Sequence, residues 1–146
     1  MKIREIMTSD PACCTADVML RDVARLMVEN DCGEIPVVDS QNSKKPIGVV
    51  TDRDIVVRTL AQGRNPLELS ARDAMSSPAT TVTPDVDLDQ CATIMEEQQI
   101  RRVPVVDEQG RLCGIVAQAD IVRTARDRMA ADLVREVSES PQTQKR

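Results

Sequence analysis

Residues 35–56, with the sequence IPVVDSQNSKKPIGVVTDRDIV, decide the fold, because residues 103–122, VPVVDEQGRLCGIVAQADIV, repeat them. In each copy two apolar runs flank a polar turn, which predicts two neighbouring strands followed by a helix. The turn is two residues shorter in the second copy. The first copy has TDRD at residues 51–54, whereas the second has AQAD and keeps only the last acid, Asp120. A function of the chain has to explain this difference.

The similarity between the two copies extends upstream of these strands. Residues 18–39 align with residues 86–107 without a gap, at a shift of 68 positions that becomes 66 after the shorter turn. The unit is long and occurs only twice, which indicates a pseudo-symmetric pair and not a solenoid of short repeats. The matched positions include Val18/Val86, Leu20/Leu88, Ala24/Ala92, Met27/Met95, Glu29/Glu97, Gly48/Gly114, Val50/Val116, Asp54/Asp120, Ile55/Ile121 and Val56/Val122.

Each copy predicts the order strand, helix, strand, strand, helix, which is an α/β (α+β) chain of small sheets packed against helices. Short strands are expected after Pro11 and Pro78. Thr83-Pro84 predicts the N-cap and first turn of the second copy's first helix. The apolar faces of these first helices are expected to comprise Leu20, Val23, Ala24, Met27 and Val28 in one copy, and Leu88, Cys91, Ala92 and Met95 in the other.

The helices that follow the hairpins are expected to begin near Thr51 and Gln118. The first should stop at Gly63, and the second should continue through Val137. The resulting organisation is a first repeat at 1–65, a linker at 66–74 with a short helical turn, a second repeat at 75–130, and a helix end with a disordered tail at 131–146. The two repeats are expected to pack together as one module.

Composition excludes several classes of function. The 146 residues carry a formal charge of −5, which argues against a nucleic-acid partner. No apolar run approaches the ~20 residues of a membrane helix, and the N-terminus has no signal-peptide core, so a cytoplasmic protein is expected. The chain has no Phe, Trp or Tyr, so aliphatic residues, Met and Cys must fill its core.

Catalytic and metal chemistry have little support in the sequence. The chain has no His, no G-x-S-x-G elbow, no Walker A and no G-x-G-x-x-G loop, so we expect no enzyme and no metal site. Five Cys form no C-x-x-C pair and are expected to be reduced and mostly buried. The vicinal pair Cys13-Cys14 is the one candidate for redox chemistry, and that role requires a thiol of lowered pKa.

The proline-led strands IPVVD and VPVVD, the G-h-h-T-x-x-D phrase at 48–54 and the duplication together resemble the cystathionine-β-synthase (CBS) domain over residues 1–125. A tandem pair of this kind is called a Bateman module. The resemblance implies an adenosine-containing ligand in a cleft between the repeats: AMP, ADP or ATP, with NAD or S-adenosylmethionine ranked lower and no prosthetic group. It also implies a homodimer that signals to an effector protein in trans.

Thr51 and Asp54 allow two interpretations. T-x-x-D at the start of a helix is a capping box, in which the hydroxyl and the carboxylate each accept a backbone N–H. The same helix N-terminus suits a phosphate, and a carboxylate can accept both hydroxyls of a ribose. Capping by itself does not account for Asp120, because Ala117 has no hydroxyl and we expect Asp120 to lack a capping partner. This favours a shared contact to ribose.

The resemblance further implies two unequal sites, each combining the acid of one repeat with segments of the other. In the main site Arg53, Arg101 and Arg102 are expected to bind the phosphate groups. Arg101 and Arg102 are also typical of a solvated helix end. In the second site Glu34 opposes a phosphate. The main nucleotide-binding site comprises Thr51, Arg53, Asp54, Ala79, Thr80, Ile100, Arg101, Arg102 and Val103. The second comprises Ala12, Cys13, Cys32, Gly33 and Asp120.

Two functions remain open on this basis. The first is a regulatory module that senses an adenine nucleotide at the main site. The alternative is a ligand-independent dimerisation scaffold, which the apolar residues spaced along 121–137 favour as an oligomerisation face. Core packing is the more common use of such a stripe.

Overall fold

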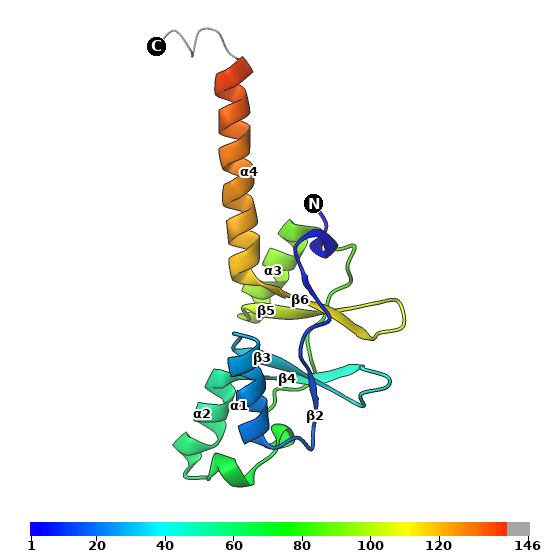
Figure 1. Ribbon diagram of the computed structural model, residues 1–146, viewed down its shortest axis with the longest axis vertical. Coiled ribbons are helices and arrows are strands. Elements are labelled where there is room, and N and C mark those ends of the chain that lie inside the picture. The colour runs from blue at the N-terminus through cyan, green and yellow to red at the C-terminus, as the bar shows by residue number, and fades with distance from the viewer. Residues whose placement is uncertain (140–146) are drawn as a thin grey trace.

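The computed structural model describes residues 1–139 and has two lobes, each with a three-stranded sheet and two helices (Figure 1). The first sheet has the strand order β2-β3-β4 and the second β1-β6-β5. The predicted mixed α/β pair of repeats is therefore confirmed. The first lobe contains β2 (Cys14–Thr15), α1 (Leu20–Glu29), β3 (Glu34–Val38), β4 (Pro46–Thr51) and α2 (Asp52–Arg58). The second contains β1 (Thr8–Ser9), α3 (Leu88–Gln98), β5 (Arg102–Val106), β6 (Leu112–Ala117) and α4 (Gln118–Glu139).

The two β-hairpins have the same register and place equivalent residues opposite one another. In the first, β3 and β4 pair antiparallel with Glu34 opposite Thr51. In the second, β5 and β6 pair with Arg102 opposite Ala117. The first residue of each hairpin therefore lies beside the residue that precedes the following helix. The strand expected after Pro78 is reduced to a single parallel bridge between Val82 and Val105.

Each lobe is completed by a segment that lies outside its own repeat in the sequence. Strand β1 pairs with β6, and Ile3 is fully buried in the second core. In the same way Ala71 and Ala74 are buried in the first core, and Ser76 forms a bridge with Val49 of β4. The N-terminal nine residues thus belong spatially to the second lobe, and the segment between the repeats packs on the first.

The cores are aliphatic, as the composition requires, but two details of the helix prediction are wrong. Ala24 is exposed and Val28 is 82% exposed, because α1 packs through Leu20, Val23 and Met27, with Leu26 partly buried beside them. These inward residues define the face that lies against the sheet, and Val28 lies outside it.

Thr83-Pro84 does not open α3, which begins at Leu88 with Asp87 as its N-cap. The physical reason is that the N-terminal segment occupies this stretch: the Ile3 and Arg4 N–H groups donate to the carbonyls of Val86 and Pro84. The backbone there is held in a turn instead of continuing as a helix.

The ends of the later helices agree with the sequence in part. Helix α2 begins after Thr51 as predicted but ends at Arg58; a 3₁₀ turn (Leu60–Gln62) follows, and Gly63 ends it with a positive φ of 74°. The linker forms two 3₁₀ turns, Pro66–Glu68 and Ala71–Asp73. The tail prediction for 140–146 lies outside the described residues. Among residues 1–139 no helix is long and apolar enough to cross a membrane.

Candidate ligand site

The capping box at the start of α2 is fully formed. The Asp54 N–H donates to Thr51 Oγ1 over 2.9 Å, and the Thr51 N–H donates to Asp54 Oδ2 over 3.0 Å. Both residues are half-buried. The structural interpretation of T-x-x-D is therefore realised, and a role in ligand binding has to use the atoms that remain, the Thr51 hydroxyl hydrogen and Asp54 Oδ1.

Asp120 also has a capping partner, so the expectation that it lacks one is wrong. The Ala117 N–H donates to Asp120 Oδ2 over 3.3 Å, and Arg123 donates to Asp120 Oδ1 over 2.6 Å. The acid reaches back to the backbone whether or not the preceding position has a hydroxyl. Retention of Asp120 is thus explained by half of a capping box and does not by itself indicate ribose binding.

An arginine-rich groove of about 690 Å³ lies at the start of α4. The hairpin register places Arg102 opposite Ala117, and the Gln118 N–H donates to the Arg101 carbonyl over 2.7 Å. The N-terminal end of a helix adds a partial positive charge. The groove, called here the arginine groove, is lined by Arg101, Arg102, Ala117, Gln118, Ala119, Val122, Arg123, Arg126 and Asp127.

The equivalent position in the first repeat carries the opposite charge. The Asp52 N–H donates to the Gly33 carbonyl over 3.0 Å, and Glu34 lies opposite Thr51. Glu34 is buried. Burial raises the pKa of its carboxyl to about 7, while Arg102 acts to lower that pKa and Asp54 acts to raise it. Glu34 therefore lies within electrostatic range of both lobes.

These contacts group the predicted residues differently from the sequence expectation. Arg101 and Arg102 contact the helix start of their own repeat, the one that carries Asp120, and Gly33 and Glu34 lie beside Thr51 and Asp52. Arg102 and Asp54 are related through Glu34, because the charges of both residues act on the Glu34 carboxyl. Sequence alignment gives the equivalent positions but not their spatial neighbours, which depend on the hairpin register.

Other predicted residues vary in accessibility. Val103 is fully buried in the second core, so its side chain has no surface to offer a base, whereas Ile100 is partly exposed beside that core. Arg53 is exposed at the first turn of α2. Ala12, Cys13, Cys32, Gly33, Ala79 and Thr80 are all half-buried.

The thiols do not have the properties that redox chemistry requires. All five are free. Burial is the main cause that raises the pKa of Cys13, and it raises the pKa of Cys14 to about 12. Thiolate is the reactive form, so the neutral thiol is favoured at this pair and the redox hypothesis loses its basis.

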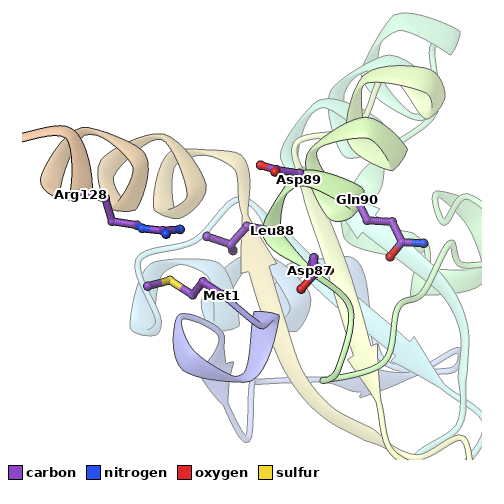
Figure 2. Close-up of a pocket in the computed structure, with 6 residues that line it drawn as sticks. All are labelled: Met1, Asp87, Leu88, Asp89, Gln90 and Arg128. Atoms are coloured by element: carbon purple, nitrogen blue, oxygen red, sulfur yellow. The ribbon is translucent and has the colours of Figure 1, made fainter. Parts of the chain in front are cut away.

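Two arginines of the groove, Arg123 and Arg126, are not among the site residues predicted from the sequence. They lie about one and two turns beyond Asp120 along α4, within a segment whose spaced apolar residues are the stronger signal in the sequence. A second depression, of about 430 Å³, was also not expected (Figure 2). There the side chains of Met1, Leu88 and Arg128 point toward one another from the N-terminus, α3 and α4.

The chain belongs to the CBS-domain family, because the CBS domain model matches residues 3–59 and 71–127. It is 35% identical over 120 residues to the uncharacterized protein MK0525 of Methanopyrus kandleri, covering 82% of this chain and 58% of that one. It is 36% identical over 120 residues to hypoxic response protein 1 of Mycobacterium tuberculosis, covering 82% of each.

Solved structures have the same fold. Hypoxic response protein I with two coordinated zinc ions has a TM-score of 0.75 at 35% identity, over 84% of this chain and 98% of that one. The CBS pair of MJ0100, in complex with 5′-methylthioadenosine and S-adenosyl-L-methionine, has a TM-score of 0.78 at 25% identity, over 88% and 98%. In residues 1–139 of the present chain no group of three or more Cys, Asp or Glu side chains is placed to hold a metal ion, and His is absent from the sequence.

Proposed function

We propose that this chain is a regulatory, non-catalytic module that binds an adenine nucleotide (AMP, ADP or ATP) and signals ligand state to a partner protein in trans. The observation that carries the proposal is the arginine groove beside the N-terminus of α4. Arg123 there is paired with Asp120, and the other three arginines, Arg101, Arg102 and Arg126, line the groove together with Asp127. Guanidinium forks and helix N-termini both favour phosphate.

In this proposal different residues bind the two parts of the ligand. The carboxylate at the start of α4, Asp120, binds the ribose, and Arg101, Arg102 and Arg126 bind the phosphates. A sulfonium ligand such as S-adenosylmethionine is disfavoured there, because its positive charge meets the arginines. The MJ0100 complexes support the adenosine part of the ligand, since both of their ligands contain it.

This proposal moves the phosphate subsite from the Thr51 side, where the sequence comparison put it, to the Asp120 side. Thr51, Arg53 and Asp54 remain a second candidate position for a ribose. Their neighbour Glu34 disfavours an anionic phosphate nearby.

The test is a dye-based thermal shift with adenosine, AMP, ADP, ATP, NAD and S-adenosylmethionine on nucleotide-free protein. Ligand at about 100 times its Kd adds ~2.7 kcal/mol of stability. We expect shifts with the nucleotides and a loss in Arg126→Gln, with Arg128→Gln as the matched control. Both arginines are exposed on α4, but Arg128 lines the other depression (Figure 2). No shift with any ligand at millimolar concentration overturns the proposal.

The scaffold alternative keeps one specific observation in its favour. Helix α4 projects away from the body of the molecule (Figure 1). Ile121 packs against the second core, but five large apolar side chains further along α4 are exposed and do not pack into the chain's own core: Val122, Met129, Leu133, Val134 and Val137. A homodimer formed through this face predicts that Leu133→Gln lowers the mass measured by light scattering, while Arg135→Gln does not. If the mass of the wild-type protein measured by light scattering is that of a monomer, this alternative is excluded.

A further inference from the structure

The carboxylate of Glu34 is the most unusual polar group in the described part of the chain. The residue is 6% exposed at the start of β3, and among residues 1–139 its Oε2 is the one buried side-chain oxygen or nitrogen without a hydrogen-bond partner. A buried polar atom left without a hydrogen-bond partner destabilises the folded chain. Such a cost calls for a role that the folded chain alone does not supply.

The position of Glu34 relates it to the arginine groove. Glu34 and Arg102 are equivalent residues of the two repeats, each opening the first strand of its hairpin two positions before a proline, Pro36 or Pro104. The duplication thus puts opposite charges at matching places. The effect of Arg102 on the Glu34 carboxyl shows that the two charges are within electrostatic range across the lobes.

The other charges around Glu34 are acidic. The negative charge of Asp54 in α2 acts to raise the pKa of the Glu34 carboxyl. The carboxylate of Asp52 lies next to Gly33, about 3.0 Å from the position that a Cβ on Gly33 would occupy. Arg102 is consequently the one cation acting on Glu34 in the described surroundings, and Glu34 is an anion acting on a wall of the proposed phosphate subsite.

We propose that Glu34 determines how strongly the arginine groove accepts a phosphate: as a carboxylate it offsets the charge of Arg102 and opposes the phosphate, and as a neutral acid it admits it. The inference rests on the proposed nucleotide site and names a specificity-determining residue for it. The charge of Glu34 acts on the phosphate of the ligand and not on its adenosine part. Glu34 therefore discriminates between ligands that differ only in phosphate.

The protonation state of Glu34 then becomes linked to binding. Burial raises the pKa of this carboxyl to about 7, so both forms are populated near neutral pH. A bound phosphate adds negative charge nearby and favours the neutral form, and nucleotide binding therefore takes up a proton. Adenosine, which has no phosphate, takes up none.

The experiment measures the Kd of AMP and of adenosine by calorimetry at pH 6 and pH 8, for wild type, Glu34→Gln and the control Glu29→Gln. Glu29 is exposed on α1 and gives the same change in charge. The AMP phosphate itself titrates near pH 6. The comparison of variants at one pH cancels this effect.

At pH 8 we expect Glu34→Gln to bind AMP about 10-fold more tightly than wild type, with adenosine affinity unchanged and Glu29→Gln like wild type. In the Arg102→Gln background the gain from Glu34→Gln should shrink, because Glu34 acts on the charge of that arginine. Calorimetry of AMP in buffers of different ionisation enthalpy should report proton uptake in wild type and less in Glu34→Gln.

The outcomes separate this inference from the proposed function. If wild type binds AMP but Glu34→Gln leaves its affinity and proton uptake unchanged, the role of Glu34 is overturned and the nucleotide site stands. If Glu34→Gln alters AMP and adenosine affinity equally, Glu34 acts on the nucleoside or on folding, and the inference again fails. If wild type binds neither ligand, the site itself is overturned, and the inference with it.

Discussion

In the first repeat, the hairpin meets its helix at a complete capping box, and the residue opposite Thr51 is the buried acid Glu34. In the second, the hairpin meets its helix at half of a capping box, and the residue opposite Ala117 is Arg102. The backbone register is the same, yet one junction is well capped and acidic, and the other is weakly capped and basic. A duplication can thus keep its architecture while its two sites diverge in the charge they accept.

The largest expected effect tests the acidic junction through stability. The Glu34 carboxyl has a pKa of about 7 in place of 4.5, so the folded state binds more protons than the unfolded state. Its contribution to stability is therefore fully present below about pH 4.5 and is lost as pH rises through 7. A rise from 4.5 to about 7, at ~1.4 kcal/mol per pKa unit, corresponds to at most about 3.5 kcal/mol.

We expect Glu34→Gln to raise the free energy of unfolding at pH 8 by up to that amount, and by much less at pH 5. Urea denaturation followed by far-ultraviolet circular dichroism suits a chain without Trp or Tyr. The control Glu29→Gln should show no such pH dependence. Equal effects of Glu34→Gln at both pH values would mean that the Glu34 carboxyl does not titrate in this range.

The next largest effect compares the two acids as ribose ligands. With the phosphate held on the Asp120 side, Asp120→Ala should weaken AMP binding about 10-fold or more, and Asp54→Ala should weaken it less. Calorimetry with each variant decides the matter. The reverse order would return the main site to Thr51 and Asp54, where the resemblance alone put it.

A smaller effect compares the caps. Thr51→Val removes the hydroxyl that accepts the Asp54 N–H, and we expect it to cost about 1 kcal/mol of unfolding free energy. Denaturation measures this directly. A loss near zero would show that the local turn does not depend on the hydroxyl.

The smallest effect runs in the opposite direction. Ala117→Thr supplies the missing hydroxyl beside Asp120, which already accepts the Ala117 N–H, and should stabilise the chain by about 0.5 kcal/mol. A change of the opposite sign would mean that the start of α4 has no room for the hydroxyl next to Arg102.

Much of the architecture could be predicted from the sequence, because the duplication and the alternation of apolar runs with turns are local or periodic signals. The hairpins, the starts of α2 and α4, and the capping box at Thr51 all belong to this part. The error at Thr83-Pro84 has a non-local cause: a Thr-Pro pair is a good helix start, but the backbone of residues 84–86 is bound by the N-terminal segment.

The candidate site was harder to predict, because its chemistry depends on which residues face each other. Residue type and position before Val103-Pro104 are enough to predict Arg101 and Arg102 as phosphate candidates, and both arginines line the arginine groove. Their partners at Ala117 and Gln118 follow from strand register, and Arg126 joins them only through the direction of α4. The burial of Glu34 and its lack of a hydrogen-bond partner are properties of the packed lobes that no pattern of residues encodes.

Residues 1–9 pack on the second lobe and residues 71–76 pack on the first, and this arrangement affects the order in which the chain can fold during synthesis. During synthesis the first lobe can close once residues 71–76 have left the ribosome, since Ala71 and Ala74 complete its core. Strand β1 must wait for its partner β6, because Thr8 pairs with Ile115. Residues 8–9 are therefore placed only after β6 has been made. Pairing across so long a stretch of chain is entropically the slowest kind of contact to form.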